Sequence, residues 1–215
     1  MPGPETDPTA VRRALEGRIA LWDNGDPYRI VPALLADPLA DGDGWVIPLL
    51  ASVEERRLYD VAIRGAHNWV TVAPHAIYYR SVWDTFGIAH ISDLHVARRI
   101  DGFAAALARA GHEQANERLL NMNDQFRHVV KYANRLHDEG HLDLIVATGD
   151  LIDYQYERDD NRRGLGNVGF LRDLLLGRST SNSCPAVEEL RVPILLTPGN
   201  HDYRKNHYHL VFDVN

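Results

Sequence analysis

The chain has 215 residues, of which 45% are hydrophobic and 25% charged, and its formal net charge at pH 7 is −7. This composition is typical of a folded globular protein, excludes a disordered chain, and argues against broad, non-specific binding of nucleic acids. No apolar run approaches the roughly 18 residues that span a membrane, and the single Cys184 excludes a disulfide framework. The first 21 residues lack the apolar core of a secretory signal, so we expect a cytoplasmic protein.

Residues 1–85 are expected to form an accessory segment of one helix followed by strands. Apolar residues recur at helical spacing from Thr9 to about Trp22, and either Asp7 or Thr9 can cap this helix. A turn-rich segment follows over 37–44. The next segments are rich in Val, Ile, Tyr and Trp and predict a small antiparallel unit, with strands over 57–64, 68–72 and 75–83.

Residues 86–215 alternate between strands and helices. Largely apolar strands, expected to be buried, are predicted over 87–92, 142–148 and 192–197. Helices are predicted over 100–109, 117–137 and 168–176. Apolar strands separated by helices indicate an α/β domain with a parallel or mixed sheet that is covered on its faces.

A polar cluster follows each of these apolar strands. The clusters are Ser92-Asp93-Leu94-His95, Thr148-Gly149-Asp150-Leu151-Ile152-Asp153 and Gly199-Asn200-His201-Asp202. Ligands of open α/β sheets bind beyond the carboxyl ends of the strands, so we expect the clusters to converge. Carboxylate, imidazole and amide groups suit Zn, Fe or Mn, and a carboxylate can bridge two ions. Each cluster alone is common by chance, but the ordered set favours a metal site.

The three blocks resemble the first three signature blocks of the calcineurin-like metallophosphoesterase superfamily, in the order of the family. The resemblance covers about residues 86–215 and implies the N-terminal part of a four-layer αββα sandwich. It also implies an enzyme, a hydrolase that acts on phosphomonoesters or phosphodiesters. Protein phosphatases of the superfamily carry Arg-Gly directly after the second Asp of the second block, where this chain has Tyr154-Gln155. The blocks therefore look more like the bacterial phosphodiesterase-type branch.

The resemblance implies two divalent metal ions, which would be Mn, Fe or Zn. By this likeness Asp93 and His95 would hold the first ion, and Asp150 would bridge both. Asn200 would bind the second ion through its side-chain oxygen. A hydroxide that bridges the two ions would then attack phosphorus.

Two further residues have implied catalytic roles. His201 would contact the phosphate or protonate the leaving group, and Asp153 would hydrogen-bond His201 and fix its tautomer. The role of Asp202 stays open. The pairs Arg98-Arg99 and Arg162-Arg163 can meet a phosphate-bearing substrate, although paired arginines on a solvated loop are the more frequent case.

The family supplies further metal-binding histidines after the third block, and one pair of them lies in a Gly-His-x-His motif. Here His207-Tyr208-His209 has the His-x-His spacing without the glycine, so we expect a core that is truncated at its C-terminal side. Two functions are open. One is a metal-dependent phosphoesterase acting on a small-molecule or nucleotide phosphoester, and the other is a truncated or degenerate, non-catalytic binding module.

Overall fold

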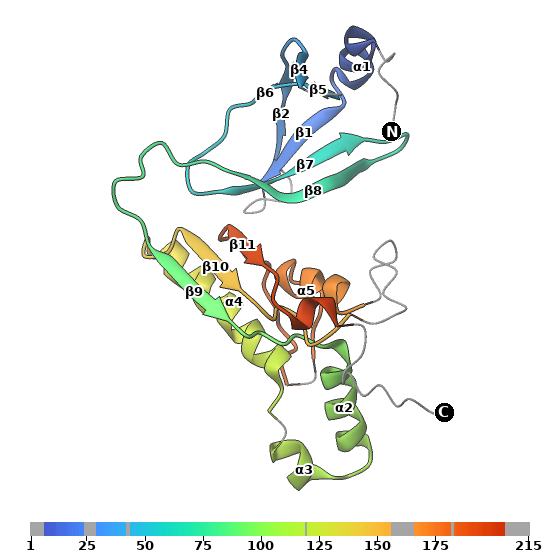
Figure 1. Cartoon of the computed structure of the whole chain (residues 1–215), viewed down its shortest axis with the longest axis vertical. Coiled ribbons are helices and arrows are strands. Elements are labelled where there is room, and N and C mark those ends of the chain that lie inside the picture. The colour runs from blue at the N-terminus through green and yellow to red at the C-terminus, as the bar shows by residue number, and fades with distance from the viewer. Residues whose placement is uncertain are drawn as a thin grey trace. The chain divides into compact units, whose positions relative to one another are not determined.

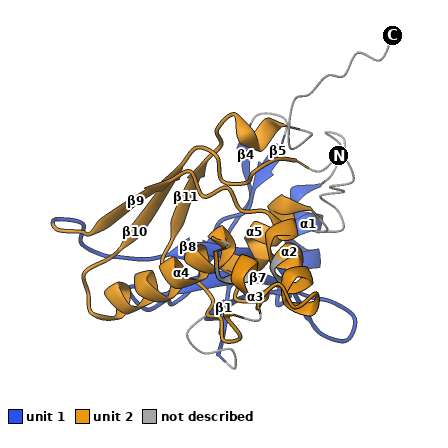
Figure 2. Ribbon diagram, turned by 90° about the horizontal axis from the view of Figure 1, so that it is seen from below, with its two compact units in different colours: residues 1–84 blue, residues 85–215 orange. Residues whose placement is uncertain are grey.

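The computed structural model describes residues 7–23, 29–41, 44–118, 120–155, 166–181 and 183–204. The chain divides into two compact units, residues 1–84 and 85–215 (Figure 2). Arg162, Arg163 and the motif 207–209 lie outside the described residues. None of the helices in the described part is long and apolar enough to cross a membrane.

Figure 1 labels the elements of both units. Those of the first unit are α1 (Pro8–Leu15), β1 (Ile19–Asp23), β2 (Ile30–Pro32), β3 (Leu34–Leu35), β4 (Leu39–Asp41), β5 (Gly44–Val46), β6 (Leu49–Leu50), β7 (Leu58–Arg64) and β8 (Trp69–Tyr78). Those of the second are β9 (Ile88–Ser92), α2 (Arg98–Arg109), α3 (Glu113–Arg118), α4 (Met122–Asp138), β10 (Leu144–Thr148), α5 (Asn167–Leu175), β11 (Ile194–Thr197) and the 3₁₀ turn η1 (His201–Tyr203).

The first unit contains a four-stranded antiparallel sheet in the order β2-β1-β7-β8, which confirms the predicted antiparallel unit. The predicted helix over 9–22 is wrong in its second half, because α1 ends at Leu15 and β1 follows. Gly17 (φ +67°) turns the chain between them, and Leu21 is buried opposite Val61 of β7. Asp7 is the N-cap of α1, as expected, since its carboxylate accepts from the amide of Thr9 at 3.0 Å.

Two details of the predicted strands are also corrected. The expected break at Ala73-Pro74 does not occur, because β8 runs from Trp69 to Tyr78 and absorbs the irregularity as a shift of register against β7. Pro74 is tolerated because β8 lies at the edge of the sheet. The segment predicted as turn-rich, 37–44, contributes to the paired strands β4 and β5.

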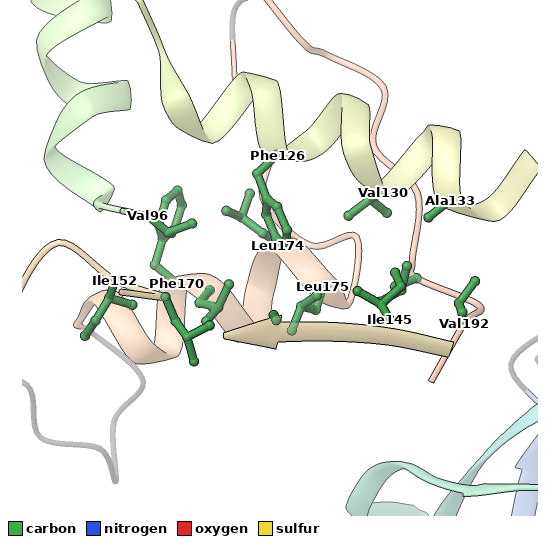
Figure 3. Close-up of a cluster of buried hydrophobic side chains, with 14 of the residues drawn as sticks. Val96, Phe126, Val130, Ala133, Ile145, Ile152, Phe170, Leu174, Leu175 and Val192 are labelled. Carbon is green, nitrogen blue, oxygen red and sulfur yellow. The ribbon is translucent and has the colours of Figure 1, made fainter. Parts of the chain in front are cut away.

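The second unit contains a three-stranded parallel sheet in the order β11-β10-β9 (Figure 1), which confirms the predicted α/β class. One face of the sheet packs on helices. Val130 of α4 lies over Ile145 of β10, and Phe126 of α4 and Leu174 of α5 belong to the same buried cluster (Figure 3). This core fixes the central strand under α4.

The sequence predicts buried strands, but the two outer strands of this sheet are partly exposed. Ile88 of β9 is 51% exposed and Leu195 of β11 is 58% exposed. Their pairing with Leu144 and Val146 places them on the face opposite Ile145, so the helices do not cover them. The expected coverage of both faces is therefore wrong for the described residues.

The predicted helix over 117–137 is divided into α3 and α4. Asn121 begins α4 as its N-cap, with its side-chain oxygen accepting from the amides of Asn123 and Asp124. An asparagine side chain that binds main-chain amides competes with a continuous helix, which accounts for the break. Gly140 (φ +82°) follows the end of α4, as predicted.

A buried ion-pair network holds α4 against α2. Arg127, only 3% exposed, lies 2.7 Å from Asp101 of α2 and 2.7 Å from Asp124, and it donates to the carbonyl of Ser179. Burial alone raises the pKa of the Asp124 carboxyl, but hydrogen bonds from Ser181, Ser183 and Arg127 outweigh burial and hold this pKa below its usual value. The network therefore depends on an ionised Asp124.

Replacing Arg127 with Met should destabilise the chain by about 3–5 kcal/mol, because two carboxylates then lose their buried partner. Urea unfolding at pH 7 measures this loss. Because folding lowers the pKa of Asp124, its contribution is present above the unfolded-state pKa and disappears as the pH falls through the folded-state value. The difference in the free energy of unfolding between the wild type and Arg127→Met should therefore become smaller when the pH falls below 3.8, the ordinary pKa of the carboxyl group.

The exposed Arg135 of the same helix stacks on the ring of Tyr132 and provides the matched control. Arg135→Met should change the free energy of unfolding by no more than about 0.5 kcal/mol. Equal losses in the two variants would contradict a structural role for the network.

Candidate metal centre

The three loops that carry the predicted clusters begin side by side at the same edge of the sheet. Ser92, Thr148 and Thr197, the last residues of the three strands, pair with one another across the sheet. Beyond the strands, the amides of His95 and Val96 donate to the carbonyls of Asp150 and Leu151 at 2.9 and 3.1 Å. The first two loops are thereby joined by main-chain hydrogen bonds, and the clusters converge as the sequence predicts.

His95, Asp150 and His201 form the centre of this group, and one potential ligand atom of each lies within 4.8 Å of the others. The Nε2 atoms of His95 and His201 are each 3.9 Å from Oδ2 of Asp150. The two rings meet edge to face, with centroids 4.5 Å apart. Oδ1 of Asp150 accepts from the main-chain amide of His201 at 2.9 Å, which fixes the carboxylate.

This donor set fits a divalent metal ion. Two ligands each about 2.1 Å from a tetrahedral ion are roughly 3.4 Å apart, and the nitrogen–oxygen separations here are only slightly wider. Imidazole and carboxylate together suit Zn, Fe or Mn. His201, which the resemblance assigns to the phosphate rather than to metal, thus lies among the side chains that could hold an ion.

The other two predicted ligands lie beside this group. Oδ1 of Asp93 is 4.0 Å from Nε2 of His95, and the side chain of Asp93 is 69% exposed. Asn200 is exposed and directly precedes η1. Three residues of the centre, Asp93, His95 and Asp150, have left-handed backbones with φ of 54°, 46° and 45°. Such strain outside glycine concentrates at functional sites.

Asp153 contacts His201, but its predicted hydrogen bond involves a different group. Nδ1 of His201 lies 3.0 Å from the main-chain carbonyl of Asp153, whereas the carboxylate oxygen Oδ1 is 3.6 Å away. The same Oδ1 lies 3.8 Å from Nδ1 of His95. Oδ2 of Asp153 pairs with Arg99 at 2.7 Å, so Arg99 is not the merely solvated residue that its sequence context favours.

Asp202, whose role the sequence leaves open, joins the second loop to the third. Its carboxylate accepts from the amides of Leu151, Ile152 and Gly199 at 3.2, 2.8 and 2.6 Å. Gly199 is required at this junction, since a Cβ there would lie 2.4 Å from the amide nitrogen of Asp150. In the sequence, Asp202 could have been found as a short carboxylate side chain three residues after the turn at Gly199, a spacing at which aspartate often accepts from main-chain amides.

Asp202→Asn should lower the free energy of unfolding by about 1–3 kcal/mol, because an amide has one accepting oxygen for three amide donors. Chemical denaturation measures the loss. Asp138→Asn, on the exposed end of α4, is the control and should unfold like the wild type. If Asp202→Asn matched this control, the carboxylate would not be holding the two loops together.

Comparison with known proteins agrees with this geometry. Residues 86–214, more than half of the chain, match the model of a protein family described as calcineurin-like phosphoesterase. No curated protein matched the chain. The family match supports divalent-metal binding and metal-dependent hydrolysis of phosphoesters in general. The chain belongs to the calcineurin-like phosphoesterase family.

Proposed function

We propose that the unit formed by residues 85–215 hydrolyses small-molecule phosphomonoesters or phosphodiesters with two divalent metal ions. The observation that carries this proposal is the convergence of His95, Asp150 and His201 from three separate strand ends. A structural ion-pair network would not require two imidazole Nε2 atoms to face one carboxylate oxygen. That arrangement suits an ion between them.

The proposed metal ligands are Asp93, His95, Asp150 and Asn200. When bound, the ions would polarise the phosphoryl oxygens and lower the pKa of a water molecule. Asp150 is prepared to bind metal, since Oδ1 is held by the amide of His201 while Oδ2 faces the two imidazoles. The exposed Asp93 and Asn200 lie where a substrate can approach.

The proposed catalytic residues are His201 and Asp153. Nδ1 of His201 lies 3.0 Å from the carbonyl of Asp153 and 3.3 Å from Nη1 of Arg204, and its Nε2 faces the centre. There Nε2 would contact the phosphate, or in the protonated imidazole give its proton to the leaving-group oxygen. Asp153 would stabilise the imidazolium, because its carboxylate lies 3.6 Å from Nδ1.

We also propose that the parallel sheet is one layer of a four-layer αββα sandwich. The face opposite the helices carries Ile88, Val146 and Leu195, and two of these side chains are more than half exposed. An apolar face of this kind is expected where one sheet packs on a second.

Hydrolysis of bis(p-nitrophenyl) phosphate and p-nitrophenyl phosphate by the full chain with added Mn²⁺ tests the proposed reaction. Asp150→Asn should lower kcat/KM at least about 100-fold, since a neutral amide holds a divalent ion poorly. Asp138→Asn removes a surface carboxylate of α4 and should retain the wild-type rate. A wild-type rate no higher than that of Asp150→Asn would refute the proposal.

Metal analysis separates the enzyme from a non-catalytic binding module. The full chain, equilibrated with Mn²⁺ and desalted, should hold two ions, and chelation should abolish hydrolysis. His95→Ala should lower the metal content because it removes an imidazole that faces Asp150. One ion or none on a folded wild-type chain would favour the binding module.

A further inference from the structure

A single carboxylate, that of Asp153, lies behind both imidazoles of the centre. Its Oδ1 is 3.8 Å from Nδ1 of His95 and 3.6 Å from Nδ1 of His201. On the opposite side, the Nε2 atoms of both rings face Asp150. The two rings therefore lie between two carboxylates of the same loop, three residues apart.

This arrangement matches the protonation that metal binding requires. A neutral imidazole has one N–H, and a ring that gives its Nε2 lone pair to an ion, as proposed for His95, carries that N–H at Nδ1. The carboxylate of Asp153 faces Nδ1 of both rings, while Nε2 of both rings faces Asp150. Such a partner behind a ligating histidine orients the ring toward the ion.

Arg99 holds the other oxygen of this carboxylate. Its Nη2 lies 2.7 Å from Oδ2 of Asp153, and its guanidinium carbon lies 5.3 Å from the centre of the Tyr154 ring. The buried Asn167 ties the adjoining main chain together, accepting from the amide of Arg98 and donating to the carbonyl of Tyr154. Arg99 and Asp153 are thus brought together by hydrogen bonds of their immediate neighbours.

We propose that Arg99 is a positioning residue of the metal centre. By binding Oδ2 it keeps Oδ1 of Asp153 directed at Nδ1 of His95 and His201, and so holds Nε2 of His95 toward the metal and Nε2 of His201 toward the substrate. The inference rests on the proposed function only in taking this centre as a metal site. Arg99 acts through Asp153 and needs no contact with the substrate.

The two histidines should depend on Arg99 to different degrees. Nδ1 of His201 also has the main-chain carbonyl of Asp153 at 3.0 Å, which no side-chain rotation removes. Among the described contacts of His95, the carboxylate of Asp153 is the acceptor that faces Nδ1. Loss of Arg99 should therefore loosen His95 more than His201.

The affinity of the full chain for Mn²⁺, measured by isothermal titration calorimetry, tests this inference. In Arg99→Gln the affinity should fall about tenfold, the lower end of the effect of removing partners of metal ligands. Arg99→Lys should restore much of the affinity, since an ammonium group can hold one carboxylate oxygen.

Arg98→Gln is the matched control, because Arg98 is the preceding residue of α2 and faces Asp173 and Phe170. It should keep the wild-type Mn²⁺ affinity. If Arg99→Gln bound Mn²⁺ as tightly as Arg98→Gln, the proposal would be overturned. Metal binding needs no turnover, so this result is independent of whether the protein hydrolyses phosphoesters.

We expect the variants to fold, because the side chain of Arg99 is 42% exposed, and circular dichroism checks this. If Arg99→Gln did not fold, Asp153→Asn would provide the second test. The amide removes the carboxylate from both rings and should lower Mn²⁺ affinity by about tenfold or more. Unchanged Mn²⁺ affinity in a folded Asp153→Asn would overturn the proposal.

Discussion

The parallel register of β9, β10 and β11 is the constraint on which the candidate metal centre depends. It sets Ser92, Thr148 and Thr197 at one level, so three loops start from one edge of the sheet. The pairing continues past the strands as an isolated parallel bridge between Val96 and Ile152. Because helices pack on Ile145 of the central strand, this edge is held by the core of the unit rather than by the loops themselves.

The loops need additional support because their backbones are strained. Asp93, His95 and Asp150 adopt left-handed conformations that cost non-glycine residues free energy. The three amides that donate to Asp202 offset that cost at the second loop and join it to the third. The close approach of Gly199 to Asp150 then brings His201 within reach of the other two side chains.

The sequence predicts local features of this protein better than contacts between distant segments. The positions of the clusters and the parallel sheet follow from apolar strands that end in short polar motifs, a pattern read within a few residues. The spacing of Ile19 and Trp22 fits a helix face, and only their pairing with β7 makes them a strand. The exposure of Ile88 depends on what covers the sheet, which its own segment does not encode.

The same distinction separates the candidate ligands from the residues that support them. His95 and Asp150 stand out because they occur in short motifs, whereas Asp202 and Arg99 act on loops about fifty residues away along the chain. Apart from the spacing of Asp202 from Gly199, neither residue has a local mark that tells a loop anchor from a solvated side chain. Only the folded arrangement brings Asp202 to the amides of the second loop and Arg99 to the carboxylate of Asp153.

The second loop is the organising element of the centre because it supplies both carboxylates. Asp150 faces the Nε2 atoms of the two imidazoles, and Asp153 lies on their Nδ1 side. Two free carboxylates this close would compete for a cation, but the charge of Asp153 is offset by Arg99. The charge of Asp150 is left facing the imidazole nitrogens, so in the proposed function one loop would both orient the histidines and direct a divalent ion to a single side of them.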